Sequence, residues 1–387
     1  MDYRLRHRFG STRGFEGHVQ GNRVTLLHDG EQCFPAMLEA IAQAQHEVLL
    51  EMYWFGSDAT GRRFADALIE RARAGVQVVV IYDAIGSFEA DASQWARMRQ
   101  AGVSVYEYNP IAPWRRRFRI GVVNNRNHRK MLIVDRNVGF TGGVNIGDPW
   151  APEAEGGEGW RDDMVRVEGP AVAELCGVFL HGLSTIAERE VSRPPTALED
   201  GDAEGASPVR VLANHFFGER RAIRRAYLER IRAAKQSVYI TNSYFVPDGA
   251  IRRALVRAAS RGVDVRVLLP AESDVPAVYY ASRRNYEWLL KRGVRLFEWV
   301  GNVLHSKTAS VDGTWCTVGT YNLDYRSWRF NLEVTVSIDD HEVASALESR
   351  FLLDLQRAVE VRLDQLRYRS LGERFFENFF YLFRKML

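Results

Sequence analysis

"HRKMLIVD", residues 128 to 135, and "HSKTASVD", residues 305 to 312, are two copies of one short pattern. In each copy a lysine follows the histidine by two positions, and an aspartate follows the lysine by five. After six further residues come "GGVN", residues 142 to 145, and "GTYN", residues 319 to 322. A single pattern of this kind is weak evidence, but two full copies indicate that the chain contains a duplicated unit.

The stretches around the two copies repeat as well. The run "EVLLEMYWF" matches "SVYITNSYF", "RARAGVQVVVIYD" matches "AASRGVDVRVLLP", and "RQAGVSVYEY" matches "LKRGVRLFEW". Each series alternates a helical apolar pattern with a run of β-branched residues, which is typical of crossover units in a parallel or mixed sheet. The sequence therefore predicts an α/β protein made of two similar halves.

A stretch rich in proline, glycine and acidic residues separates the halves. It reads "VSRPPTALEDGDAEGASP" and has the composition of a linker. We predict a first repeat over residues 1–190, a linker over 191–208, a second repeat over 209–365 and a C-terminal helix over 366–387. The content of 46% apolar and 26% charged residues is ordinary for a globular chain, with no transmembrane run and no secretory signal expected.

The histidine and lysine of each copy suit an anion. Residues i and i+2 of a strand point to the same face, so each pair projects into one site. A protonated lysine beside the histidine repels cations and offers no lone pair, so we expect neither a metal nor another cofactor. The two pairs together predict a phosphate site.

With this duplicated pattern the chain resembles the phospholipase D superfamily. The resemblance covers nearly the whole chain and implies two α-β-α sandwich domains related by a pseudo-two-fold axis, with one active site shared between them. It implies that Lys130 and Lys307 neutralise the phosphate oxygens. One histidine attacks phosphorus to form a phosphohistidine, and the other acts as acid and base. The resemblance favours His128 as the nucleophile and His305 as the acid/base.

Other residues of the two copies complete the predicted site. Asn145 and Asn322 are placed to donate amide hydrogen bonds to the same phosphate. Asp162 and Glu333 follow the two copies at corresponding places, and in the family such an acid binds the second ring nitrogen of the histidine. The signature also includes two aspartates among the catalytic set, although their odd offset from the lysine favours a structural role: Asp135 and Asp312.

The first half carries about 14 residues that the second lacks, because 26 positions separate Gly102 from His128 and 12 separate Gly293 from His305. This insertion is basic and aromatic, and it suits an anionic membrane surface or single-stranded nucleic acid about equally. Its predicted membrane contacts are Trp114, Arg115, Arg116, Arg117 and Phe118.

The C-terminal stretch "RSLGERFFENFFYLFRKML" places its phenylalanines on one face of a helix. Such a helix either docks on the protein core or lies in a membrane interface, and it is too short to span a bilayer. For the second possibility the predicted membrane contacts are Phe376, Phe379, Phe380 and Phe383.

Within the superfamily, "FTGGVNI" and "GTYNLDYRSWRFNLEVTV" resemble bacterial cardiolipin synthases of the form without N-terminal transmembrane helices. That resemblance implies transfer of a phosphatidyl group from phosphatidylglycerol to the hydroxyl of a lipid or an alcohol. The expected partners are an anionic phospholipid membrane and phospholipid substrates, without nucleic acid or an obligatory protein partner. The expected location is peripheral, on the cytoplasmic side of the bacterial inner membrane. A phospholipase D-type hydrolase, a nuclease and a non-catalytic lipid-binding protein remain alternatives.

Overall fold

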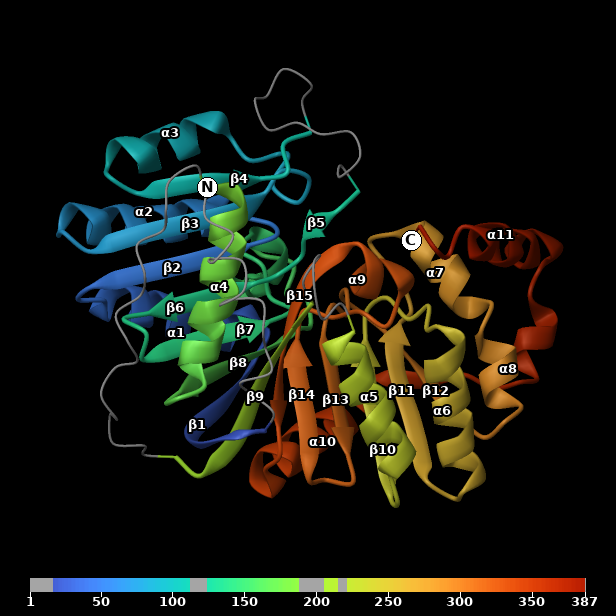
Figure 1. Ribbon diagram of the computed structural model, residues 1–387. Helices are drawn as coiled ribbons and strands as arrows, with labels where there is room; N and C mark the ends of the chain where they lie inside the picture. Colours follow the sequence, from blue (N-terminus) through green and yellow to red (C-terminus); the bar gives the residue numbers. More distant parts are fainter. Residues whose placement is uncertain (1–16, 112–123, 188–204, 215–220, 387) are drawn as a thin grey trace, which may run out of the picture.

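The computed structural model describes residues 17–111, 124–187, 205–214 and 221–386. Two halves of similar architecture lie side by side, the first on the left of Figure 1 and the second on the right. The predicted membrane contacts from Trp114 to Phe118 and most of the predicted linker lie outside the described residues.

Within the described residues, seven strands of each half follow the same spatial order. The first half runs β1-β8-β7-β6-β2-β3-β4 and the second runs β9-β15-β14-β13-β10-β11-β12, and the antiparallel pair β1 and β9 joins them. Strands β2, β3 and β4 are parallel, as are β10, β11 and β12, whereas the remaining pairs of both series are antiparallel. This matching order confirms the predicted pseudo-symmetric α/β fold.

The strands of the first half are β1 (Val19–His28), β2 (Glu47–Met52), β3 (Gln77–Asp83), β4 (Ser104–Tyr108), β5 (Arg126–Asn127), β6 (Met131–Val134), β7 (Val138–Gly142) and β8 (Asp163–Glu168). Those of the second half are β9 (Ser207–Asn214), β10 (Ser237–Asn242), β11 (Asp264–Pro270), β12 (Arg295–Trp299), β13 (Lys307–Val311), β14 (Trp315–Gly319), β15 (Asn331–Ile338) and β16 (Ala358–Glu360). Strand β16 pairs with β12 at one edge, and β5 pairs with β15 of the other half.

Helices cover the sheets. The α-helices are α1 (Asp29–Gln43), α2 (Ala59–Arg73), α3 (Ala92–Gln100), α4 (Val172–Ile186), α5 (Ala222–Ala233), α6 (Gly249–Ser260), α7 (Pro276–Arg283), α8 (Tyr286–Leu290), α9 (Tyr325–Arg329), α10 (His341–Leu355) and α11 (Leu371–Leu382). The described residues also form the short 3-10 helices η3 (Asp148–Trp150), η4 (Glu153–Glu155) and η5 (Gln365–Tyr368). Several α-helices begin after an aspartate whose side chain accepts backbone N–H groups of the first turn: Asp58, Asp248 and Asp340.

Three large apolar clusters form the core. One lies between the first sheet and α1, α2 and α3, and a second lies between the second sheet and α5, α6 and α8. The third contains α4 and part of α10 together with strands of both halves, among them Val165 of β8 and Val318 of β14. Because this third cluster is shared, the two halves are fixed against each other by buried apolar surface.

Among the described residues, no helix combines the length and the apolar character that a membrane crossing would need. The last helix, α11, lies at the edge of the second half beside α7 (Figure 1).

Candidate active site

Each motif histidine is attached to the backbone of the other half. Strand β5 pairs with the start of β15, and the backbone N–H of His128 donates to the carbonyl oxygen of Leu332 at 3.0 Å. In the symmetric arrangement, the N–H of His305 donates to the carbonyl oxygen of Arg161 at 2.8 Å. Leu332 and Arg161 directly precede the two acids predicted to assist the histidines. Both histidines therefore lie at the boundary of the halves.

The acids bind the histidines across the same boundary. Nδ1 of His128 lies 3.0 Å from Oε2 of Glu333, and Nδ1 of His305 lies 2.7 Å from Oδ2 of Asp162. A carboxylate beside Nδ1 holds the ring proton on that nitrogen and leaves Nε2 with its lone pair in the neutral form. The sequence predicted that these acids bind the histidines but did not say that each acid serves the histidine of the other half.

Both acids are held in the charged form. Burial alone would raise the pKa of Glu333, but the charge of His128 and hydrogen bonds from His128 and Thr320 lower it. Burial likewise opposes the charge of Asp162, but Lys307, His305 and a 3.0 Å hydrogen bond from Nε1 of Trp150 lower its pKa. Each imidazole therefore faces a carboxylate that stays ionised.

The two motif lysines are buried, and the charge of Lys307 affects the pKa of Lys130. Nζ of Lys130 donates to the carbonyl oxygen of His128 at 2.9 Å, and Nζ of Lys307 donates to that of His305. Burial, followed by repulsion from Lys307, lowers the pKa of Lys130 to about 7. Burial lowers the pKa of Lys307 to about 8, although Asp162 favours its charge. A bound anion would favour both ammonium groups, which is the property expected of a phosphate site.

Both histidines favour the neutral form. Burial lowers the pKa of His128 to about 4, with Glu333 opposing the shift and Lys130 adding to it. Burial and Lys307 also lower the pKa of His305. A neutral imidazole with a free Nε2 is the form that can attack phosphorus.

The two asparagines are oriented by hydrogen bonds to their oxygens. Oδ1 of Asn145 accepts the backbone N–H of Trp54 at 3.1 Å, and Oδ1 of Asn322 accepts the hydroxyl of Ser243 at 2.9 Å. Within the described part of the chain neither Nδ2 has a hydrogen-bond partner, so both amides remain available as donors.

The two motif aspartates lie in turns, and their carboxylates bind backbone N–H groups of a neighbouring segment. Asp135 and Asp312 have positive φ angles of 49° and 54° in the hairpins that follow β6 and β13. The carboxylate of Asp135 accepts three backbone N–H groups, those of residues 45, 46 and 47, at 2.7 to 2.8 Å. Asp312 accepts those of residues 235, 236 and 237 at 2.7 to 2.9 Å. We assign both a structural role, as their offset from the lysines indicates, and not a catalytic one.

Aromatic residues that the sequence analysis did not single out enclose the histidines. The ring of Tyr53 lies 4.9 Å from that of His128, and Nζ of Lys130 lies 5.1 Å from the centre of the Tyr53 ring. The rings of Trp150, Trp160 and Tyr244 lie 5.2, 5.9 and 6.3 Å from that of His305. Tyr53 and Tyr244 follow β2 and β10 in the matched runs "EMYWF" and "TNSYF", but the repeat aligns Tyr53 with Ser243 and Tyr244 with Trp54, so it gave no signal for this pair.

The predicted membrane contacts on α11 have different environments. Phe380 is partly buried and stacks on Tyr280 of α7 with 6.0 Å between ring centres. Phe376, Phe379 and Phe383 are 44%, 42% and 45% exposed. None of these four residues belongs to the three large core clusters.

The chain is similar to proteins that make phospholipids. A family model described as "Cardiolipin synthase, PLD-like domain" matches residues 37–167 and 227–355, one match in each half. Cardiolipin synthase 1 of Bacillus cereus is 33% identical over 96% of this chain and 74% of its own length. The probable cardiolipin synthase YwiE of Bacillus subtilis is 33% identical over 95% of this chain and 72% of its own.

Solved structures show the same fold at low sequence identity. Phosphatidylserine synthase of Haemophilus influenzae aligns with a TM-score of 0.71 and 13% identity over 94% of this chain and 95% of its own. Polyphosphate kinase of Porphyromonas gingivalis aligns with a TM-score of 0.61 and 14% identity over 88% of this chain and 49% of its own.

Proposed function

The chain belongs to the cardiolipin synthase, PLD-like domain family, and from this premise we propose that it moves a phosphatidyl group from phosphatidylglycerol to the hydroxyl of a second lipid or an alcohol. It is a cardiolipin synthase-like enzyme, and phosphatidyl transfer is the activity its curated relatives support. The donor, the acceptor and the covalent intermediate are our proposal. The observation that carries it is the pair of carboxylate-bound imidazoles flanked by two buried lysines.

In the first step Nε2 of His128 attacks the phosphorus of the donor. A P–N bond forms while the P–O bond to the glycerol headgroup breaks, and His305 gives its proton to the departing oxygen. The products are glycerol and a phosphatidyl group on His128. Glu333 stabilises the positive charge that His128 acquires, because it accepts the hydrogen bond from Nδ1.

In the second step His305, now neutral, takes the proton from the acceptor hydroxyl. The oxygen of that hydroxyl attacks phosphorus and displaces Nε2 of His128, which restores the enzyme. The pKa of His305 is lowered in the free protein, and the negative charge of a phosphate would raise it, so the substrate itself favours the proton on the acid. Lys130 and Lys307 neutralise the phosphate oxygens in both steps.

The aromatic rings that surround the two histidines favour a transferase over a hydrolase. A phosphohistidine that waits for an alcohol must be kept from water. Trp150 and Trp160 are buried beside His305, and both histidines are at least nine-tenths buried. The hydrolase remains the second candidate, since the same groups would activate water.

The test uses the full chain with phosphatidylglycerol vesicles, with and without glycerol or another alcohol, and identifies the products by mass spectrometry. We expect a new phosphatidyl ester of each added alcohol and, without one, a phospholipid with two phosphatidyl groups. Phosphatidic acid as the sole product at every acceptor concentration would contradict the transferase. Cleavage of an oligonucleotide without action on lipid would favour a nuclease.

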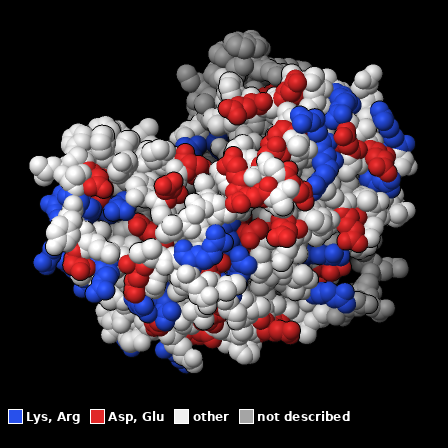
Figure 2. All heavy atoms as spheres, turned by 180° about the vertical axis from the view of Figure 1, so that it is seen from behind, with Lys and Arg blue, Asp and Glu red and all other residues white. Residues whose placement is uncertain are grey.

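The proposed setting is the surface of an anionic membrane, on the cytoplasmic side of the bacterial inner membrane. The substrates lie in that surface, and the phenylalanines of α11 are exposed at one edge of the molecule. On the face shown in Figure 2, blue and red side chains are interspersed, so that face as a whole carries no field of one sign. Binding to an anionic membrane surface would therefore depend on a local group of cationic side chains.

A further inference from the structure

Helix α11 buries a charged residue and exposes much of its aromatic face. A helix on a globular protein usually buries its apolar face and exposes its charged one. In α11 the most buried residue is Glu377, which is 2% exposed, whereas Phe375 on the opposite side is 61% exposed. The carboxylate of Glu377 accepts a hydrogen bond from Arg369 at 2.6 Å and lies 3.6 Å from Arg283 of α7. Charged contacts of Glu377 and the packing of Phe380 on Tyr280 therefore hold α11 to the body, while Phe375 and Phe379 are left outward.

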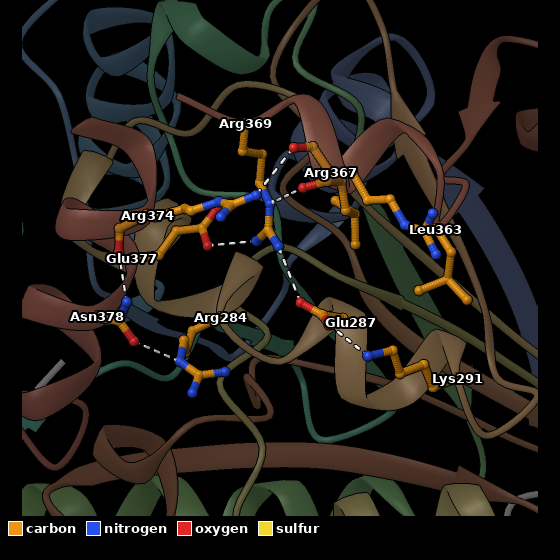
Figure 3. A pocket seen from close by; sticks show the side chains of 10 residues that line it. Arg284, Glu287, Lys291, Leu363, Arg367, Arg369, Arg374, Glu377 and Asn378 are labelled. Atoms are coloured by element: carbon orange, nitrogen blue, oxygen red, sulfur yellow. Dashed lines mark hydrogen bonds and ion pairs between the residues drawn. The ribbon is translucent and has the colours of Figure 1, made fainter. Parts of the chain in front are cut away.

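An open pocket of about 360 Å³ lies on the polar side of this helix. Its side chains come from α8, α11 and the segment around η5, as Figure 3 shows. Cations outnumber acids in its lining, since five arginine and lysine side chains face only Glu287 and Glu377. The two acids are already engaged: Glu287 pairs with Lys291 at 2.7 Å and Glu377 pairs with Arg369 at 2.6 Å.

Three guanidinium groups of the pocket form no ion pair with a described carboxylate. Arg284 donates to the amide oxygen of Asn378 at 2.7 Å, and Arg374 donates to the backbone oxygen of Arg367 at 3.0 Å. The side chain of Arg367 makes no hydrogen bond to a described residue. Guanidinium groups without a carboxylate partner that line one hollow suit an anion with several oxygens, such as a phosphate.

An apolar cluster links α11 to the neighbourhood of His305, whereas the pocket is separate from the catalytic residues. Phe380 and Tyr381 of α11 belong to one apolar cluster with Val278 of α7 and with Tyr244, whose ring lies beside His305. None of the residues that line the pocket belongs to the two motifs. If α11 contacts the membrane, this cluster would place the site of His305 near the lipid surface.

We propose that the pocket lined by Arg284, Arg367 and Arg374 binds the phosphate of an anionic phospholipid in the membrane surface, while the outward phenylalanines of α11 enter the interface. This inference rests on one part of the proposed function, namely that the substrate is a membrane lipid. The bound lipid is not the reacting one, and its role is to hold and orient the enzyme.

The experiment measures binding to phosphatidylcholine vesicles with and without phosphatidylglycerol. In the double variant Arg367→Gln/Arg374→Gln we expect the apparent Kd for the phosphatidylglycerol vesicles to rise about thirtyfold, with little change for phosphatidylcholine alone. Both arginines are exposed, so the thermal midpoint should stay unchanged. The matched control, Arg71→Gln/Arg73→Gln at the end of α2, removes the same charge from the other half and should leave binding unchanged.

Equal loss of binding in the control, or full binding by the double variant, would overturn the inference. So would saturable binding of inorganic phosphate that the double variant loses while its vesicle binding persists, because that result identifies a site for soluble anions. Activity on detergent-dispersed phosphatidylglycerol separates the two proposals, since the double variant should keep it. A wild type that binds the vesicles through these arginines but transfers no phosphatidyl group would contradict the proposed function and support this inference.

Discussion

Nδ1 of His128 lies 3.0 Å from Oε2 of Glu333, although 205 positions separate the two residues in the sequence. The reciprocal contact, between His305 and Asp162, spans 143 positions. Each half thus supplies a histidine to the site and an acid to the histidine of its neighbour. Neither half supplies both members of either pair in the site, so the site requires both halves in their observed arrangement.

Glu333→Gln should lower kcat by on the order of 10²- to 10⁴-fold, with a smaller effect on KM. The amide keeps the volume but removes the charge that stabilises the His128 imidazolium and fixes its tautomer. Loss of the carboxylate also lowers the pKa of His128 further, so the acid limb of the kcat profile should move to lower pH. Steady-state kinetics over a pH series measure both effects.

Glu360→Gln provides the control for this variant, because Glu360 is an exposed acid of the edge strand β16. It should leave kcat and the pH profile unchanged. A Glu333→Gln enzyme with wild-type kcat, or with a loss confined to KM, would show that Glu333 does not act through His128.

The order of the two histidines can be tested by trapping the intermediate. In His305→Ala the first step lacks its acid and the second lacks its base, so a phosphatidyl group attached to His128 should accumulate. Intact-mass and peptide mass spectrometry of the denatured enzyme after incubation with phosphatidylglycerol would locate it. An adduct on His305 in the His128→Ala enzyme, and none on His128 in His305→Ala, would reverse the assigned roles.

The sequence predicted the fold and the residues that meet at the candidate site, because both depend on short patterns that occur twice. Two matching series of helices and strands predicted two similar halves, and the spacing of His128 and Lys130 predicted that they share one face. The exchange of acids did not follow, because it depends on how β5 pairs with β15 of the other half. Contacts between distant segments leave no local pattern, which is also why the aromatic neighbours of His305 were missed.

The sequence of α11 also could not show that Glu377 faces the body while Phe375 faces outward. The apolar arc of the phenylalanines was evident, but the arc alone does not say whether it faces the core or the outside. The charged pairs of Glu377 with Arg369 and Arg283, together with the stacking of Phe380 on Tyr280, fix the orientation. Arg283 and Tyr280 belong to α7, nearly 100 positions earlier.

The pH dependence of kcat/KM should have the shape of a bell. His128 is neutral above its pKa of about 4, so the rate should rise through that pH. His305 must carry the proton that it donates in the first step, and its pKa is lowered in the free protein, so the rate should begin to fall as pH rises through that lowered value. Loss of charge from Lys130 and Lys307, above pKa values of about 7 and 8, should lower the rate further. Because bound phosphate raises the pKa of both lysines, the alkaline limb of kcat should lie at higher pH than that of kcat/KM. Identical alkaline limbs in the two profiles would exclude the lysines as their source.

Lys130→Met should abolish activity and raise stability at neutral pH. The pKa of Lys130 is about 7 in the folded protein against an ordinary value of 10.5, so the unfolded chain binds more protons between these values. Wild-type stability therefore rises with pH across that window, whereas methionine has no such dependence. The advantage of the variant should be largest below about pH 7 and nearly gone by about pH 10.5.

Urea unfolding at several pH values measures this difference, and Lys235→Met, at an exposed lysine, is the control. The control should show no advantage that changes with pH. If Lys130→Met were less stable than the wild type at pH 7, the charged pairs in the site would stabilise the fold more than burial of the lysine costs.

Single substitutions can distinguish the role of the exposed face of α11 from that of the edge that packs on α7. Phe379→Ser removes a side chain that is 42% exposed, so we expect little change in thermal midpoint and at least a tenfold weaker binding to phosphatidylglycerol vesicles. Phe380→Ser removes a ring that stacks on Tyr280, so it should lower the thermal midpoint. Differential scanning fluorimetry and vesicle sedimentation distinguish these effects. If α11 instead served only to cover the core, both variants would lose thermal stability and neither would change vesicle binding.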